Sequence, residues 1–163
     1  MRYAIYILML LLLSGCAVSP EEEARREQKL ASIAEVLEQS VGVEELGEDK
    51  RCLSEHEYRS FRALGDRHML FEGRRDRLWV NTLRTRCHDL RYGDVLIVRS
   101  FSTRRLCNAD TFQVTDWFDW PWYRRWPWHW RAGWGTGPVC SLGDFRPVTE
   151  EQVAEIEAII RGR

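Results

Sequence analysis

The chain has 163 residues, of which 44% are hydrophobic and 30% charged, and its formal net charge is −1. This composition excludes a protein that crosses the membrane many times, and it is too apolar for a disordered chain. It is typical of one globular domain with short appendages. Two residue types are unusual: there are five cysteines, an odd number, and seven of the eight tryptophans lie between Trp117 and Trp134.

Residues 1–15 have the pattern of an export signal. One positive charge at Arg2 precedes an apolar run over residues 3–13, and small residues follow. A run this short does not span ~30 Å of hydrocarbon as a stable helix, so it predicts a cleaved signal peptide. The residues at the end of this segment, Leu13-Ser14-Gly15-Cys16, resemble the lipobox of bacterial lipoproteins, which implies lipidation of the Cys16 thiol. An ordinary signal peptide with a chance cysteine is the alternative.

Lipidation would fix the chain to a membrane, because each buried methylene adds ~0.8 kcal/mol of membrane affinity. The residue after the cysteine is Ala17. In the sorting rule of Gram-negative lipoproteins, Asp at this position favours the inner membrane. The resemblance therefore implies a cell-envelope protein on the outer membrane that faces the periplasm, with the membrane as a partner through the lipid anchor.

The other four cysteines form an even set in an oxidising compartment, which predicts two disulfides. They are Cys52, Cys87, Cys107 and Cys140. Their gaps are unlike the close ligand pairs of a zinc site, and no Cys-x-x-Cys motif is present, so we expect no metal and no cofactor. Three connectivities are open. We favour Cys52–Cys87 with Cys107–Cys140, since each pair would enclose one hairpin-like half of the body.

Charge divides the mature chain into three parts. Residues 17–49 carry ten acidic and three basic side chains, residues 50–146 eighteen basic and eleven acidic, and residues 147–163 four acidic and two basic. A basic body thus lies between acidic ends.

Residues 16–49 predict a lipidated cysteine followed by an acidic tether helix. Ser19 caps the helix, Pro20 suits its first turn, Glu22 completes a capping box, and Gly42 ends it. This 19–41 helix is a candidate surface for an envelope protein partner. The alternatives are a tether packed on its own domain and a partly frayed stalk. Its apolar stripe consists of Leu30, Ile33, Ala34, Leu37 and Val41.

Residues 50–148 predict a β-rich body. Ser54-Glu55-His56-Glu57 is a second capping-box pattern and predicts a short helix near Cys52. Apolar runs at 69–71 and 78–80 flank Gly73-Arg74-Arg75-Asp76, which predicts a hairpin. Residues 95–98 form the most hydrophobic run, and we expect them at the centre of the sheet. Further strands are expected near residues 106–107, 111–114 and 140–145, with Asp94 and Asp110 making turn hydrogen bonds.

Residues 149–163 predict a second helix. Thr149 caps it, Gln152 sits three residues later, and Val148 can pack on Val153 as a hydrophobic staple. We expect this helix to lie across the sheet. The predicted fold class is α+β, a small antiparallel β-sheet or part-closed barrel with an N-terminal helix, a C-terminal helix and two disulfides. The residues of the helix that face the sheet are Val153, Ile156, Ile159 and Ile160.

Several segments of the body together resemble a known family. They are Cys52-Leu53, Asn81-Thr82-Leu83 ahead of Cys87, and the segments 90–94, 106–111 and 140–145. In this pattern, over about residues 50–148, the chain is similar to a family of small Gram-negative bacterial lipoproteins with a domain of unknown function. The resemblance implies a secreted disulfide domain and brings no catalytic residues. The chain departs from the family pattern at residues 117–134, which have the form of an enlarged loop.

The Trp-rich loop 117–134 is the strongest candidate contact site. Nine of its eighteen residues are Trp, Tyr or Phe, and two Trp-Pro-Trp units exclude a regular helix. Indole rings favour the headgroup region of bilayers and Arg pairs with phosphate, so we predict contact with anionic lipid or lipopolysaccharide. The alternatives are stacking on glycan and packing on the protein's own domain. The candidate contact residues are Trp117, Trp120, Trp122, Tyr123, Arg124, Arg125, Trp126, Trp128, Trp130, Arg131 and Trp134.

We expect no catalytic residues. The side chains of His88 and Asp89 would point apart on an extended segment, and no nucleophile-elbow, zinc-protease or phosphate-loop motif is present. The sequence therefore favours a non-catalytic binding or structural module, with a periplasmic enzyme acting on envelope glycan as the minor alternative. An exported protein is not expected to bind nucleic acid. The histidines are scattered at His56, His68, His88 and His129.

Overall fold

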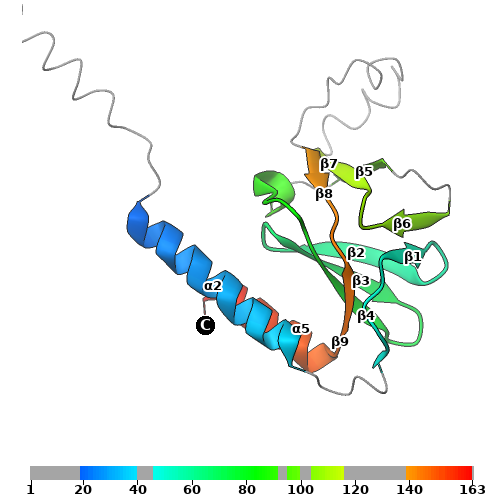
Figure 1. Cartoon of the computed structure of the whole chain (residues 1–163), viewed down its shortest axis with the longest axis horizontal. Helices are drawn as coiled ribbons and strands as arrows, with labels where there is room; N and C mark the ends of the chain where they lie inside the picture. The colour runs from blue at the N-terminus through cyan, green and yellow to red at the C-terminus, as the bar shows by residue number, and fades with distance from the viewer. Residues whose placement is uncertain (1–18, 40–45, 92–94, 100–103, 116–138, 163) are drawn as a thin grey trace, which may run out of the picture.

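The computed structural model describes residues 19–39, 46–91, 95–99, 104–115 and 139–162 (Figure 1). Cys16 and the Trp-rich loop 117–134 lie outside these residues, so the predictions made for them stay predictions. The elements are α2 (Pro20–Glu38), β1 (Cys52–Ser54), β2 (Tyr58–Leu64), β3 (His68–Gly73), β4 (Leu78–Thr82), the 3₁₀ turn η1 (His88–Arg91), β5 (Val95–Arg99), β6 (Arg105–Cys107), β7 (Thr111–Thr115), β8 (Val139–Ser141), β9 (Phe145–Val148) and α5 (Glu150–Arg161).

The strands in the described part of the chain form three antiparallel sheets. The largest has the order β2-β3-β4-β9, a second has the order β5-β7-β8, and β1 pairs with β6. A bridge between Lys50 and Phe145 joins the start of the body to β9. The predicted class of α+β with antiparallel sheets is confirmed, and the sheets do not close into a barrel.

The four-stranded sheet is the middle layer of the molecule. Figure 1 shows α2 and α5 side by side against one of its faces and the two smaller sheets beyond the other. Side chains alternate between the two faces along a strand. Thus Met69 and Phe71 of β3 enter the core shared with the small sheets, while Leu70 enters the core shared with the helices. His68, two residues before Leu70, therefore belongs to the helix side.

A β-bulge between Tyr58 and Ser60 explains why strand β2 was missing from the sequence prediction. The register of β2 against β3 shifts there, so an extra residue enters the strand. Tyr58 and Phe61, three residues apart, consequently pack against the same core. Their spacing breaks the alternation of two that identifies a strand in a sequence.

The two helix starts agree with the capping signals. Ser19 accepts a hydrogen bond from the Glu22 backbone N–H, although the Glu22 carboxylate pairs with Arg26 instead of closing a full capping box. Thr149 and Gln152 form both halves of the predicted box at the start of α5. Helix α2 ends at Glu38 with Gln39 as its C-cap, before the predicted end at Gly42, which lies outside the described residues.

The apolar stripe predicted for the first helix divides in two. Ile33 and Leu37 are buried together with Val36, which the prediction did not include. Leu30 is only half-buried and Ala34 is exposed. The buried members contact α5 and the sheet, so the tether packs on its own domain along this part of its length.

The disulfides are present, but their predicted pairing is wrong. The structure joins Cys52 to Cys107 and Cys87 to Cys140. Cys52 and Cys107 stand directly opposite each other in the β1–β6 pair, which connects strands 55 residues apart in the sequence. The predicted pairing assumed that each disulfide closes a hairpin between strands that are neighbours in the sequence. It is wrong because β1 pairs with β6, a strand far along the chain.

Two other local predictions are wrong. Residues 54–57 form a tight turn and not a helix, because the Glu57 carboxylate accepts from the Ser54 N–H as in a capping box but β2 begins at the next residue. Strand β5 lies at an edge of its sheet, where β7 is central. The prediction that residues 95–98 lie at the centre of the sheet rested on their hydrophobic composition alone.

The predicted turn bond at Asp110 is confirmed: its carboxylate accepts from the Cys107 N–H at 2.6 Å.

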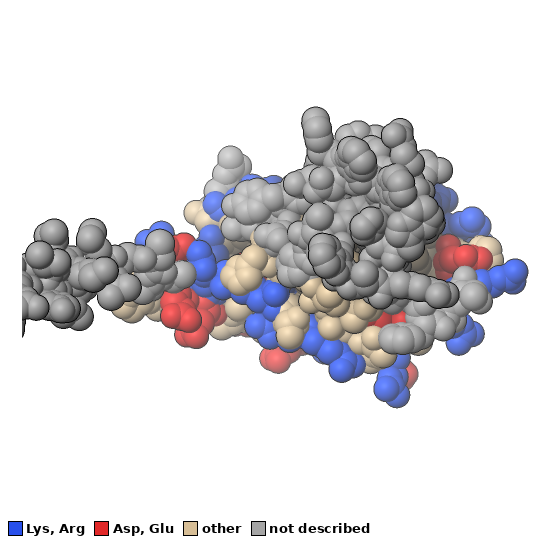
Figure 2. Space-filling model, turned by 90° about the horizontal axis from the view of Figure 1, so that it is seen from above, with Lys and Arg blue, Asp and Glu red and all other residues tan. Residues whose placement is uncertain are grey.

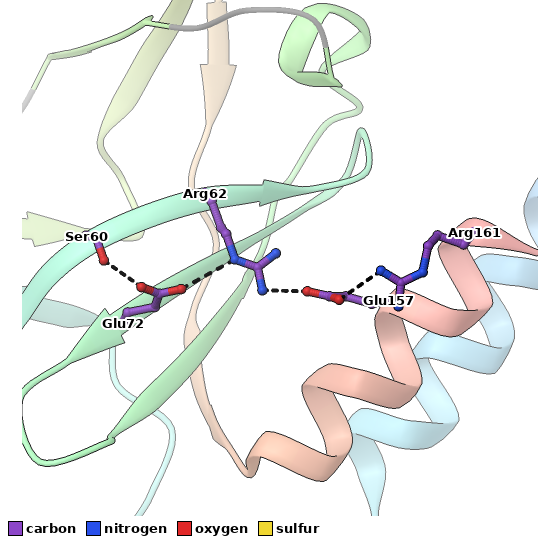
Figure 3. A network of polar contacts seen from close by, with 5 residues as sticks. All are labelled: Ser60, Arg62, Glu72, Glu157 and Arg161. Carbon is purple, nitrogen blue, oxygen red and sulfur yellow. Dashed lines mark hydrogen bonds and ion pairs between the residues drawn. The ribbon is translucent and has the colours of Figure 1, made fainter.

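A polar network fixes α5 to the sheet (Figure 3). Glu72 of β3 accepts from Ser60 at 2.7 Å and from Arg62 of β2, and Arg62 also reaches Glu157 of α5. Glu157 receives a second bond from Arg161. The hydrogen bond from Arg62 lowers the pKa of the Glu157 carboxyl. This network is one link between the acidic C-terminal segment and the basic body.

Candidate functional site

A cleft of about 860 Å³ lies between α2 and one end of the four-stranded sheet. Its walls come from three regions: the face of α2 that carries Leu30 and Ala34, the adjoining ends of β3 and β4, and the connection from β8 to β9. Sites for small molecules in proteins usually enclose roughly 300–1,000 Å³. The cleft therefore has the size of a ligand site.

His68 stands at the back of this cleft. It is the first residue of β3, paired in register with Leu64 and Thr82, and only 4% of it is exposed. It also lines a second hollow of about 420 Å³ on the α2 side. No hydrogen bond to its ring occurs within the part of the chain that the structure describes. No fully buried side-chain nitrogen there lacks a partner, so the ring nitrogens reach the surface of the hollows.

The charge state of His68 follows from its surroundings. Burial, together with the charge of Arg67, lowers the pKa of the imidazole to about 4, while Asp66 acts in the opposite direction. The ring is therefore neutral at pH 7, with one nitrogen able to donate a hydrogen bond and the other able to accept one. Asp66 itself is held by Arg86 at 2.7 Å.

Two arginines at the cleft have unused donors. Arg84 donates from Nε to the Leu142 carbonyl at 3.2 Å, a contact that orients its guanidinium. The side chain of Arg67 forms no hydrogen bond or ion pair with the described residues. The Leu83 N–H donates to the Arg67 carbonyl at 2.9 Å, so Arg67 lies beside the residue that precedes Arg84.

The acidic residues of the cleft are mostly engaged. Asp49 receives Arg146 at 3.1 Å, and the Arg146 guanidinium also donates to the Leu37 carbonyl of α2. Asp144 accepts from the Asn108 amide at 2.5 Å. Glu38, exposed in the last turn of α2, has no such partner among the described residues. Among the charged side chains that line the cleft, Arg67, Arg84 and Glu38 form no ion pair with the described residues, and the Asp144 carboxylate is bound only to a neutral amide.

Asn81 fixes the sheet side of the cleft. Its fully buried amide donates to the Gly143 carbonyl at 2.5 Å and accepts from the Gly143 N–H at 3.0 Å. A side chain at Gly143 would meet the Thr82 carbonyl oxygen at 2.1 Å, so only glycine permits this approach. The pair holds the β8–β9 connection against the end of β4, where Thr82 and Gly143 line the cleft.

Sequence reasoning did not find this site. His68 was noted only as one of several scattered histidines, and Arg67, Arg84 and Gly143 were not singled out. The signal that could have helped is the alternation along β3, which puts His68 on the same face as Leu70. The residues of the cleft come from segments as far apart as α2 and β9, and the sequence shows no spacing that unites them. His88, exposed in η1, takes no part in the cleft.

The described residues contain no group of three or more His, Cys, Asp or Glu side chains arranged to hold a metal ion. In the same residues, neither helix is both apolar enough and long enough to cross a bilayer. Acidic and basic side chains lie next to one another on the face seen in Figure 2, so the charge division of the sequence does not become a division of that surface.

A family of unknown function (DUF6491) matches residues 1–118 of the chain, which is more than two thirds of its length. The chain belongs to this family. The predicted resemblance to a family of unknown function is thus confirmed, but the matched range includes the first 49 residues and stops before residue 119. His68, Arg67 and Arg84 lie within the matched range, and Gly143 lies outside it. No curated protein and no solved structure gives a significant match.

Proposed function

We propose that this protein is a lipid-anchored binding module of the cell envelope with no catalytic role. The observation that carries the proposal is that all four cysteines of the described residues are joined in two disulfides. Structural disulfides persist in oxidising compartments, which supports export. The fifth cysteine, Cys16, follows the lipobox-like exit of the apolar N-terminal run. Its thiol is the one that a lipoprotein pathway would modify.

The form of α2 supports a role as tether. The first hydrogen bond from α2 to the rest of the described domain is at Lys29, whose Nζ donates to the Ile160 carbonyl at 3.0 Å. Residues 20–28 before it have mostly exposed side chains, and at 1.5 Å per residue they extend over about 14 Å. Only three positions separate Cys16 from Ser19. Such a segment would hold the domain away from the bilayer that carries the lipid.

Metabolic labelling tests the anchor. The full chain, produced in a Gram-negative host with an alkyne-bearing palmitate, should become labelled and partition into detergent. Cys16→Ser should abolish both, whereas the Cys52→Ala/Cys107→Ala double variant should keep the label. Label in the Cys16→Ser protein, or none in the unaltered chain, would contradict the proposal. Ala17→Asp should move the labelled protein from outer- to inner-membrane fractions on a density gradient.

We propose further that the Trp-rich loop 117–134 contacts anionic lipid or lipopolysaccharide. The support is its composition, together with the pairing of its flanking strands: β7 and β8 are antiparallel neighbours, with Gln113 opposite Val139. A short linker can therefore replace the loop without moving either strand. The chain from residue 18 should show a blue shift of tryptophan emission when anionic vesicles or lipopolysaccharide are added.

The linker variant provides the control for this measurement. Its remaining tryptophan, Trp79, is 3% exposed, so its emission should be blue and indifferent to lipid. Emission of the unaltered chain that does not respond to lipid would contradict the contact. The competing function, a protein-binding helix over residues 19–41, has less support, because Ile33, Val36 and Leu37 are already buried against the domain.

A further inference from the structure

We propose that the cleft between α2 and the four-stranded sheet binds an amphipathic anion, a molecule with a carboxylate or phosphate head and an alkyl chain. The inference deepens the binding-module proposal and rests on it for the binding role, but it does not depend on the lipid anchor. The cleft has the volume of a small-molecule site, about 860 Å³.

The head group is identified by the donors that converge on the cleft. The Arg67 guanidinium has no partner among the described residues, and Arg84 has only its Nε engaged, so both present N–H groups that can donate to a carboxylate or phosphate. The backbone bond from Leu83 to the Arg67 carbonyl keeps these two positions together. Of the acidic residues that line the cleft, Asp49 is paired with Arg146 and Asp144 accepts from the Asn108 amide, whereas Glu38, in the last turn of α2, has no partner among the described residues.

The buried histidine is the second observation that indicates a ligand. His68 is 4% exposed, lines the cleft and has no hydrogen-bond partner among the described residues. The ring nitrogens reach the surface of the hollows, so a ligand head group in the cleft can hydrogen-bond to the imidazole in place of water. A neutral ring can donate to the head group from one nitrogen without adding a charge to the site.

The alkyl chain is indicated by the opposite wall. Leu30 and Ala34 belong to the apolar stripe of α2, yet the core buries neither of them fully. Both line the cleft together with Leu37 and Leu83. An apolar wall that faces a basic end is complementary to an amphiphile, and it gives a neutral or purely ionic ligand less contact.

Histidine-edited NMR of the full chain in a non-ionic maltoside detergent tests the proposal. The His68 signal is assigned by its absence in His68→Gln. The probes are hexanoate, hexyl phosphate, 1-hexanol and inorganic phosphate. Hexanoate or hexyl phosphate should shift the His68 signal saturably, with a Kd on the order of 1 mM for ligands of this size. Their relative affinities distinguish a fatty acid from a phosphate ester as the source.

Matched variants separate the cleft from the rest of the surface. Arg67→Gln and Arg84→Gln should each weaken hexanoate binding roughly 10-fold, the usual effect of removing a charged hydrogen bond. Arg59→Gln, on exposed β2 away from the cleft, should not. Ala34→Phe should fill the apolar wall and abolish binding, while Ala31→Phe, exposed on the same helix but outside the cleft, should bind normally.

Several outcomes would overturn the inference. They are hexanol binding as tightly as hexanoate, inorganic phosphate binding as tightly as hexyl phosphate, no saturable shift with any anion, or equal behaviour of the two phenylalanine variants. An unchanged far-UV circular dichroism spectrum shows that each variant is folded. If none of the anions binds but Cys16 is labelled, the cleft proposal is wrong and the lipid-anchor proposal holds. If the anions bind but Cys16 is not labelled, the lipid-anchor proposal is wrong and the cleft proposal holds.

Discussion

Asn81 illustrates, at the scale of single residues, how this domain satisfies polar groups that it buries completely. Its amide uses both a donor and an acceptor on the backbone of Gly143, 62 residues further along the chain. An amide buried without such partners would be costly. Loss of this pair would therefore destabilise the fold by more than the net free energy of two hydrogen bonds. The two residues depend on each other, because the backbone of residue 143 can come this close only without a side chain.

We predict that Gly143→Ala destabilises the domain by about 3 kcal/mol, because the new methyl group would overlap the Thr82 carbonyl and force the backbone apart. Gly47→Ala is the control. Gly47 has open space around it but a φ of +87°, so alanine there should cost only about 1 kcal/mol of backbone strain. Urea unfolding followed by circular dichroism measures both. A loss at Gly143 no larger than that at Gly47 would refute the steric explanation.

His68 should make stability depend on pH. Its pKa is about 4 in the folded chain and 6.5 in the unfolded one, so between these values the unfolded state binds the extra proton. The free energy of unfolding is then complete above pH 6.5 and is lost as the pH falls towards 4. The loss is about 3 kcal/mol, at 1.36 kcal/mol per pKa unit. Urea titrations at several pH values should show this slope in the native chain.

The corresponding titrations of His68→Gln should lack this part of the slope, since glutamine does not titrate. Carboxylates contribute to the pH dependence of both proteins and cancel in the difference between them. A difference that stays constant from pH 7 to pH 4 would show that the imidazole titrates normally in the folded state.

At the scale of elements, the sequence predicted what depends on neighbouring residues. The caps at Ser19 and Thr149 and the hairpin around Gly73 follow from local hydrogen bonds and turn conformations, and the structure confirms them. Strand order and pairing depend on contacts between distant segments. The edge position of β5 and the pairing of β1 with β6 were therefore mispredicted, and the bulge in β2 concealed a whole strand.

The candidate site shows the same limit. The apolar stripe of α2 was visible in the sequence, but which of its residues face the core and which face the cleft depends on how α2 meets α5. That contact is fixed by Gln152, whose amide donates to the Val36 carbonyl at 2.9 Å and to the Gln39 carbonyl at 3.2 Å. Sequence reasoning recognised Gln152 only as part of a cap.

We predict that Gln152→Ala costs about 2 kcal/mol, because it removes one half of the capping box of α5 and leaves two carbonyls at the end of α2 without their donor. Glu155→Ala, exposed on the same helix, should change stability by less than about 0.5 kcal/mol. Hydrogen exchange should also become faster in α2 of the Gln152 variant. Equal stability of the two variants, with unchanged exchange in α2, would contradict this role.

At the scale of the whole molecule, one disulfide lies within a small sheet and the other ties the second small sheet to the segment before η1. Cys52–Cys107 lies within the β1–β6 pair, and Cys87–Cys140 joins the segment before η1 to β8. The enclosed segments are nearly equal, with separations of 55 and 53 residues, so each bridge should restrict the unfolded chain by about the same amount, roughly 4 kcal/mol. They differ in burial: Cys87 and Cys140 are 0% and 1% exposed, while Cys52 and Cys107 are half-buried.

Removing the Cys87–Cys140 bridge by double alanine substitution should therefore destabilise the chain more than removing Cys52–Cys107, because it also leaves a cavity in the core. Urea unfolding under oxidising conditions gives the order. Thiol titration of the denatured proteins, each also carrying Cys16→Ser, tests the connectivity itself. Each double variant keeps one intact bridge and should show no free thiol. If the pairs were instead Cys52–Cys87 and Cys107–Cys140, each variant would lose one cysteine from both bridges, and the two that remain would titrate as free thiols or form a non-native bridge that peptide mapping identifies.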